Sequence, residues 1–209
     1  MRFATRTTPI RIFFGTILAT LLLSVASFAQ TTQQEQTSPD FSNIKIKNFG
    51  RMDDRFYRGA QPKKQEDYEA LKSLGIHTVI DLQADPKGYE KGIVESLGMR
   101  YFNIPMEGKT YPKQEWVDAF MKIVDDPETG KFYVHCAGGR HRTGSMGAVY
   151  RYTKYGWTFD QVYAEMKKFD FYTSWGHGDY KKFVEDYWQQ IQAKKAGAAA
   201  ATATASGTR

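Results

Sequence analysis

Short apolar runs alternate along the chain with segments whose apolar residues recur every three or four positions. Ile76–Leu82 is an apolar, β-branched run, which indicates a buried strand. Before it, a segment that begins at Pro62 places Tyr68 and Leu71 on one helical face, and Gly75 ends it. The pattern therefore predicts a helix followed by a buried strand.

The same pattern extends over most of the chain. It predicts further strands at 44–46, 55–58, 99–104 and 132–135. It predicts further helices at 89–97, 112–124, 143–155, 158–169 and 178–192. This alternation favours a single α/β domain, with a central, mostly parallel sheet flanked by helices.

The N-terminal end has the composition of a targeting segment. Residues 12–28 are apolar, follow three arginines and lead into a small-x-small sequence that ends at Ala29. Residues 1–29 are therefore interpreted as a signal peptide, which predicts an exported protein, periplasmic or secreted. An uncleaved membrane anchor is the alternative, and only then would a membrane be a partner.

The rest of the chain divides into three parts. Residues 30–42 are rich in Gln, Thr and Ser and are interpreted as a flexible linker, and 43–192 form the domain. Residues 193–209 are rich in Ala and are expected to be disordered, because they have no apolar face to bury. The net charge is +6, but three of the arginines lie in the predicted signal peptide, so the charge does not predict a nucleic-acid partner.

The sequence His-Cys-Ala-Gly-Gly-Arg-His-Arg-Thr-Gly at 135–144 carries the candidate chemistry. It holds the only cysteine, Cys136, and Arg142 follows six positions later. A glycine-rich loop between a strand and a helix start presents unpaired N–H groups, and the helix dipole adds positive potential. Such a loop binds anions and favours a thiolate. A lone cysteine also excludes an internal disulfide.

This loop resembles the Cys-x5-Arg-Ser/Thr signature of the cysteine-dependent protein tyrosine phosphatases. The order His-Arg-Thr-Gly at its end is most similar to the atypical dual-specificity phosphatases of the plant and fungal type and their bacterial relatives. The segments Phe-Tyr-Arg-Gly-Ala-Gln-Pro at 56–62 and Ile-Pro-Met-Glu-Gly-Lys at 104–109 support the same subfamily. The resemblance covers about residues 43–190 and implies the phosphatase fold for the domain.

The resemblance also implies a role for each loop residue. Cys136 would be the nucleophile, Arg142 would bind two phosphoryl oxygens, and Thr143 would donate its hydroxyl to the thiolate or cap the helix. His135 would orient the loop and tune the thiol, with an ordinary buried histidine bonded to backbone as the alternative. The substrate-binding residues, which offer backbone N–H groups or cationic side chains, would be Ala137, Gly138, Gly139, Arg140 and His141.

The proton donor to the leaving group is less clearly marked. The family usually takes this proton from an aspartate on a separate loop, but the matching loop, 105–110, carries Glu107 and no aspartate. Glu107 is therefore the candidate general acid, with a solvated turn residue as the alternative interpretation. Asp81 and Asp85 are lesser candidates.

The sequence thus predicts a phosphatase that hydrolyses phosphate monoesters, phosphotyrosine first, through a cysteinyl-phosphate intermediate. Its partner would be a phosphorylated protein or a small phosphorylated substrate, with no cofactor and no nucleic acid. A metal is not expected, because the chain has no cysteine pair and no His-x3-His spacing. Three alternatives stay open. They are the same chemistry on inositol phosphates, pyrophosphates or another small polyanion, a non-catalytic phosphate-binding module, and a rhodanese-like sulfurtransferase.

Overall fold

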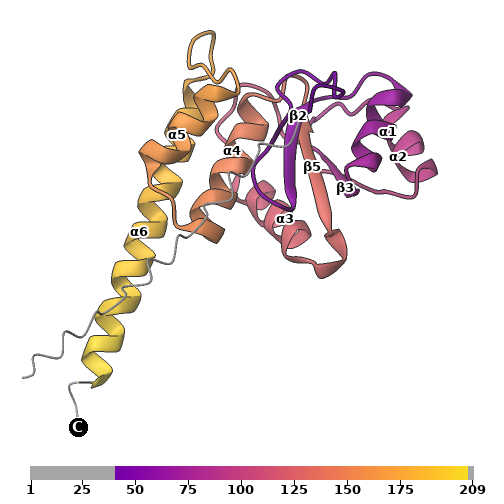
Figure 1. Cartoon of the computed structure of the whole chain (residues 1–209). Helices are drawn as coiled ribbons and strands as arrows, with labels where there is room; N and C mark the ends of the chain where they lie inside the picture. Colours follow the sequence, from indigo (N-terminus) through magenta and orange to yellow (C-terminus); the bar gives the residue numbers. More distant parts are fainter. Residues whose placement is uncertain (1–40, 207–209) are drawn as a thin grey trace, which may run out of the picture. The chain divides into compact units, whose positions relative to one another are not determined.

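The fold is that of a computed structural model, in which residues 41–206 are described (Figure 1). The predicted signal peptide and nearly all of the predicted linker lie outside the described residues. The strands are β1 (Gly50–Arg51), β2 (Phe56–Ala60), β3 (Ile76–Asp81), β4 (Arg100–Asn103) and β5 (Lys131–Cys136). The helices are α1 (Gln65–Ser73), α2 (Glu90–Ser96), α3 (Gln114–Asp125), α4 (His141–Tyr150), α5 (Phe159–Lys168) and α6 (Gly178–Ser206), with short η1 (Pro127–Thr129) and η2 (Arg151–Tyr155) turns.

The five strands form one sheet in the order β1-β2-β5-β3-β4. All neighbouring pairs are parallel except β1 with β2, which is antiparallel. Strand β5 is in the middle, so the loop that follows it leaves from the carboxyl end of the central strand. This confirms the predicted α/β fold and is the usual place for a ligand site in a parallel sheet.

Helices cover both faces of the sheet because successive strand residues point to opposite sides. On one face Phe132, Val134 and Cys136 belong to a core that also holds buried residues of α3, α4, α5 and α6. On the other face Tyr133 and Val79 pack with residues of α1 and α2. Burial of both faces explains why apolar residues follow one another at Val79–Ile80 in β3 and at Phe132–Val134 in β5, without the alternation of a half-exposed strand.

The predicted strand at 44–46 is wrong. Ile44 and Ile46 are buried in the core beside α1 and α2, but they pair with no strand, and the edge strand β1 begins only at Gly50. Their alternation reflects burial of every second side chain and not pairing with a neighbouring strand.

The helix predicted at 143–155 is divided in the structure. Helix α4 ends at Tyr150, and the chain continues as a π-turn to Gly156, which has a left-handed backbone conformation.

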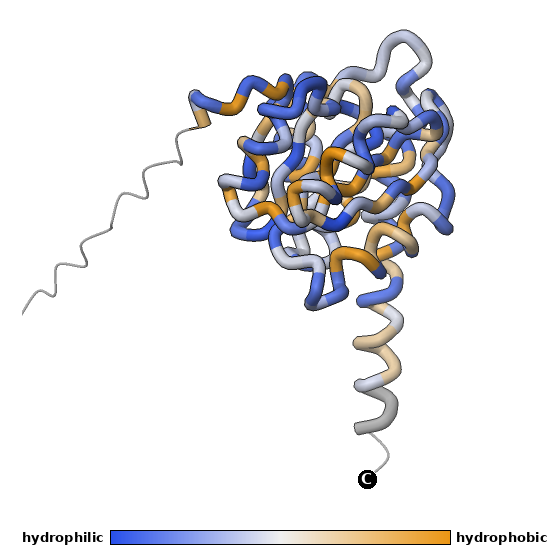
Figure 2. Tube along the Cα trace, turned by 90° about the vertical axis from the view of Figure 1, so that its right-hand side faces the viewer, coloured by the Kyte–Doolittle hydropathy of each residue, from blue (hydrophilic) through white to orange (hydrophobic). Residues whose placement is uncertain are grey.

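The prediction of a disordered tail from residue 193 is corrected, because α6 continues without a break to Ser206. Residues 193–202 are exposed, and the far end of α6 runs free of the sheet and its other helices (Figures 1 and 2). Adding residues to an existing helix costs little, and alanine has the highest helix propensity. The packed first turns of α6 therefore supply the nucleus that the isolated tail lacks.

No helix within residues 41–206 is both long enough and apolar enough to cross a membrane. The predicted signal peptide lies outside this range.

Candidate active site

The anion loop lies between the end of β5 and the start of α4. Cys136 is the last residue of β5, and α4 begins at His141. Cys136 is 4% exposed and packs with the core on the α4 side of the sheet. The strand–loop–helix unit predicted from the sequence is therefore present, with the thiol at its base.

Two side chains from outside the loop hold its carbonyl groups. The Asn48 side-chain amide donates a hydrogen bond to the Gly138 carbonyl at 2.8 Å, and the buried Arg58 guanidinium donates one to the Gly139 carbonyl at 2.7 Å. Arg58 also lies over the Phe169 ring, 4.1 Å from its centre. Because these carbonyls are turned toward the scaffold, the peptide units are oriented with their N–H groups available to an anion.

Gly139 is the loop residue at which only glycine fits. Its φ is +67°, and a Cβ added there would overlap the carbonyl group of Gly59 on strand β2. At Gly138 the nearest atom to an added Cβ is a side-chain atom of Arg140 at 3.8 Å. The sequence pattern does not distinguish the two glycines, but the backbone geometry requires glycine at position 139 and not at position 138.

Gly139→Ala is therefore expected to lower the free energy of unfolding by about 2–4 kcal/mol through strain and overlap with β2. Phosphate binding to the folded fraction is expected to weaken as the loop shifts. Urea unfolding and isothermal titration with phosphate measure the two effects. Gly138→Ala is the matched control and is expected to stay near wild type. Similar losses in both variants would contradict the assigned geometry.

The surroundings of Cys136 favour its thiolate. Burial opposes the charged form, but the Arg142 guanidinium and hydrogen bonds from Thr143 and from the Gly138 amide outweigh it and lower the pKa of the thiol. A thiol of lowered pKa at the carboxyl end of the central strand, beside a helix start, supplies a larger fraction of the nucleophilic thiolate at a given pH than a free cysteine does.

Thr143 lies inside the first turn of α4 and does not cap the helix, because Arg140 occupies the cap position. The Thr143 hydroxyl is fully buried and has no oxygen or nitrogen partner among the described residues. It is therefore available to the sulfur of Cys136. The geometry favours the hydroxyl-donor role over the alternative of helix capping.

Thr143→Ala is expected to raise the pKa of the Cys136 thiol and to slow breakdown of a cysteinyl-phosphate about tenfold, because the sulfur loses a hydrogen bond. Iodoacetamide alkylation against pH measures the first effect, and the burst of p-nitrophenol from p-nitrophenyl phosphate measures the second. Ser145→Ala is the matched control, since Ser145 is also a buried α4 residue with an unpartnered hydroxyl. Equal effects of the two substitutions would show that Thr143 acts only through packing.

Two carbonyls from different strand ends position Arg142. Its Nη1 donates to the carbonyl of Leu82, which follows β3, at 3.3 Å and to that of Met106, which follows β4, at 3.1 Å. One side of the guanidinium is therefore fixed to the scaffold. The remaining N–H donors of the planar guanidinium are left for the oxygens of a tetrahedral oxyanion.

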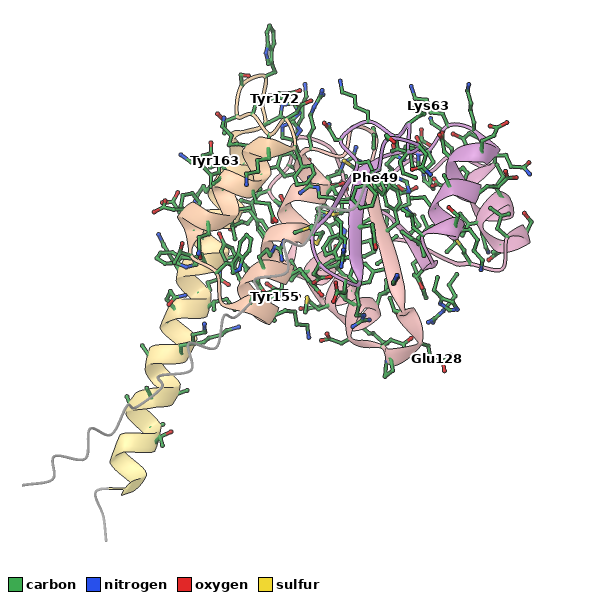
Figure 3. The ribbon with its side chains drawn as sticks, viewed as in Figure 1. Phe49, Lys63, Glu128, Tyr155, Tyr163 and Tyr172 are labelled. Atoms are coloured by element: carbon green, nitrogen blue, oxygen red, sulfur yellow. The ribbon has the colours of Figure 1, made fainter. Side chains whose placement is uncertain are left out.

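A pocket of about 270 Å³ lies over the nucleophile. His141 and His177 form one wall, with ring centres 3.9 Å apart, and the His141 Nε2 lies 2.9 Å from the Tyr172 carbonyl. Tyr172 belongs to the segment between α5 and α6 (Figure 3). The pocket lining consists of Gly108, Lys109, Cys136, Ala137, Gly138, Arg140, His141, Arg142, Tyr172, His177 and Tyr180. The sequence motif does not indicate Tyr172, His177 and Tyr180, because they lie more than 25 residues downstream of the loop.

The two side chains expected to be cationic in the loop differ. Arg140 lines the pocket and pairs with Asp170 at 3.3 Å. His141 is buried, and this burial, together with the neighbouring His177, lowers its pKa to about 4. His141 is therefore neutral at pH 7, and only Arg140 of the two adds charge to the pocket.

The Glu107 side chain is not part of the pocket lining. It is 55% exposed and lies 3.8 Å from the Lys113 ammonium, while the Glu107 carbonyl accepts a hydrogen bond from the Tyr180 hydroxyl at 3.4 Å. This is the geometry of the solvated turn residue, so we do not assign Glu107 the proton-donor role. Asp85 is also exposed and outside the pocket.

His135 and Asp81 are behind the loop and not in the pocket. Both are fully buried, on the sheet face covered by α1 and α2. The His135 Nε2 lies 2.8 Å from the Glu90 carboxylate, so the interpretation of a histidine bonded to backbone is not supported. Glu90 has no motif around it, and the sequence analysis missed it.

A protein-family model matches most of the chain. Residues 24–185 match the model described as "PTP-NADK: DSP-PTPase phosphatase fused to NAD+ Kinase". The match covers more than half of the chain and includes every residue of the anion loop.

Individual proteins agree with this match. The chain is 29% identical over 127 residues to inositol diphosphatase DSP3 of Arabidopsis thaliana, which covers 58% of this chain and 61% of that protein. It is 27% identical over 127 residues to the probable tyrosine-protein phosphatase DG1060 of Dictyostelium discoideum, covering 58% and 75%. The chain thus spans less than two thirds of the length of the Arabidopsis protein. Among solved structures, the core catalytic domain of the PP-IP phosphatase SIW14 from S. cerevisiae has a TM-score of 0.60 at 21% identity, covering 72% of this chain and 93% of that one.

Proposed function

Since the chain belongs to the DSP-PTPase phosphatase family, we propose that it hydrolyses phosphate monoesters through a cysteinyl-phosphate intermediate. The observation that carries the proposal is the Cys136 thiol with its lowered pKa, held between Arg142 and the start of α4. Every group required for covalent phosphoryl transfer, except a carboxylic general acid, is therefore present at one strand end.

The reaction proceeds in two displacements. The Cys136 thiolate attacks phosphorus, an S–P bond forms, and the bond from phosphorus to the leaving oxygen breaks with its electron pair on that oxygen. The loop amides and the Arg142 fork bind the equatorial oxygens in both steps. Water then attacks the phosphocysteine, inorganic phosphate leaves, and Thr143 stabilises the departing thiolate.

The pocket favours leaving groups that need little protonation. No carboxylate is among the pocket-lining residues of the described part of the chain, so a strongly basic alkoxide has no acid of the usual type beside it. The phenoxide of phosphotyrosine is a much better leaving group than the alkoxide of phosphoserine. Phosphotyrosine is therefore the first substrate that we propose.

The test is phosphate release by the reduced protein from a phosphotyrosine peptide and from a phosphoserine peptide of the same sequence. We expect a higher kcat/KM on the phosphotyrosine peptide. Absence of release from either peptide, and from p-nitrophenyl phosphate at any pH, would support a phosphate-binding module without turnover. Thiocyanate formation from thiosulfate and cyanide would instead support a sulfurtransferase.

A second candidate substrate is an inositol diphosphate or another small polyanion. The observation that favours it is the cationic pocket lining, where Lys109 and Arg140 add to Arg142. The leaving group from a diphosphate is itself a phosphate, which also needs little protonation. The related Arabidopsis protein is named an inositol diphosphatase. A kcat/KM on an inositol diphosphate well above that on phosphotyrosine peptides would select this candidate.

We further propose that the protein is exported, on the basis of the apolar segment at 12–28. Expression of the full chain, fractionation and N-terminal sequencing test this. A mature terminus near residue 30 in the exported fraction is the expected result, and an intact N-terminus in the cytoplasm contradicts it.

A further inference from the structure

A cluster of charged side chains is buried directly behind the anion loop. Asp81 at the end of β3, Glu90 at the first residue of α2 and His135 on β5 are all fully buried. Glu90 Oε1 lies 2.8 Å from His135 Nε2, and Asp81 Oδ1 lies 3.8 Å from His135 Nδ1. The imidazole is thus between two carboxylates.

The remaining contacts of the two carboxylates come from neutral groups. The Gln61 amide donates to Glu90 at 3.2 Å, and the Tyr101 hydroxyl and the Gln83 backbone amide donate to Asp81 at 3.1 and 2.9 Å. The other titratable groups around the ring are Tyr68 of α1, Tyr133 of β5, whose ring stacks 5.7 Å from it, and Cys136. Burial raises the pKa of Tyr68, Tyr101 and Tyr133, so all three are neutral at physiological pH.

This composition favours a protonated imidazole. Two buried carboxylates with no cation would carry a large desolvation cost, and His135 is the basic group that touches both. Burial disfavours the imidazolium, but Glu90 and then Asp81 outweigh it, so the pKa of His135 is raised. The same three side chains could be considered a metal site. Their ligand atoms lie within 4.8 Å of one another. The closest approach of Glu90 is nevertheless to Nε2 and that of Asp81 is to Nδ1, which is the arrangement of an imidazolium that donates toward both carboxylates.

The cation is positioned to act on the nucleophile. His135 immediately precedes Cys136, and their side chains leave β5 on opposite faces. Glu90 contacts Nε2, the ring atom farther from the backbone, so the carboxylate lies at the end of the ring away from β5. The negative charge on Cys136 adds to those of Glu90 and Asp81 in raising the pKa of His135, so the two neighbouring side chains are electrostatically coupled. The cluster also reaches Arg142, because the Leu82 carbonyl that holds Arg142 directly follows Asp81.

We propose that Glu90 is a positioning residue for the nucleophile, which keeps His135 as an imidazolium so that this buried cation stabilises the Cys136 thiolate through strand β5. The family resemblance assigns a tuning role to the histidine, and the structure adds the carboxylate that makes this histidine a cation. The importance of Glu90 for turnover rests on the proposed function, whereas its effect on the thiol does not.

The experiment uses the chain's single cysteine as the reporter. Iodoacetamide alkylation of Cys136 is measured against pH in wild type and in Glu90→Gln, which keeps the shape of the side chain and removes its charge. We expect the alkylation midpoint to rise by about one pH unit, so that the rate at a pH below both midpoints falls roughly tenfold. Glu90→Asp is expected to restore part of the rate. Glu95→Gln, on the exposed side of the same helix, is the matched control and is expected to match wild type.

Histidine-selective NMR of the wild-type protein gives a readout that needs no substitution. The His135 ring is expected to lose its proton at a higher pH than an ordinary histidine. A His135 ring that titrates no higher than an ordinary histidine, an unchanged midpoint in folded Glu90→Gln, or stoichiometric Zn²⁺ binding that Glu90→Gln removes would each overturn the proposal. If Glu90→Gln does not fold, the NMR titration of the wild-type protein still shows whether His135 is an imidazolium and therefore tests the proposal. A wild type with an acidic thiol and no turnover would refute the proposed function and leave this inference intact.

Discussion

Cys136→Ser is expected to reduce hydrolysis of p-nitrophenyl phosphate by more than about 10⁴-fold while the folded protein still binds oxyanions. The pKa of a serine hydroxyl is far above that of a thiol, so the groups that lower the pKa of the Cys136 thiol cannot ionise the alcohol. The loop itself is held by Asn48 and Arg58, and neither side chain depends on the sulfur. Steady-state kinetics and calorimetric titration with tungstate provide the two measurements.

The binding measurement separates chemistry from folding. Loss of tungstate binding together with activity would mean that the substitution disturbs the loop, and the kinetic result would then say nothing about the nucleophile. Activity of Cys136→Ser within tenfold of wild type would refute the covalent mechanism.

Arg142→Lys is expected to lower kcat/KM by about 10³-fold, although the positive charge is kept. The guanidinium donates to the Leu82 and Met106 carbonyls and still has donors for the phosphoryl oxygens. A lysine ammonium has three donors around one atom and cannot hold both carbonyls and two oxygens in that geometry. Rapid-quench measurements should show that phosphocysteine formation slows by a similar factor, because the Arg142 guanidinium stabilises the transition state of that step.

Arg140→Lys is the matched control, since Arg140 belongs to the same loop and lines the same pocket, and its guanidinium pairs with Asp170 and lies over the Tyr172 ring. We expect a change of less than about threefold for it, as only charge is required at that position. Equal losses for the two lysine variants would show that the pocket needs the size or shape of arginine at both positions, and that the hydrogen bonds from Arg142 to the two carbonyls are not the reason for its effect.

The parts of the site that are local in sequence could be predicted from the sequence. Cys136, Arg142 and Thr143 lie within eight residues of one strand–loop–helix unit, and the spacing alone brings them together. The sheet could be predicted as well, because β3 and β5 are buried on both faces and carry apolar runs at Val79–Ile80 and Phe132–Val134. The strand at 44–46 failed for the converse reason, since Ile44 and Ile46 are buried without a pairing partner.

The parts that depend on tertiary contacts could not be predicted. Glu90 reaches His135 from a helix 45 residues earlier in the chain, and nothing in its neighbours along the sequence indicates a buried partner. Glu107 is on the expected loop, but the direction of its side chain is decided by Lys113 and by Tyr180, which holds the loop backbone. Loop position is encoded locally, whereas side-chain direction is set by the elements packed against it.

The hydrogen bonds from Asn48 and Arg58 to the loop carbonyls have a kinetic consequence. A loop that is already in its binding shape loses little conformational entropy when an anion arrives, so we expect it to bind small tetrahedral ions more tightly than a flexible loop would. Inorganic phosphate, the last species to leave, is such an ion. Turnover is therefore expected to slow as product accumulates, and local phosphate concentration would set the working rate of the protein.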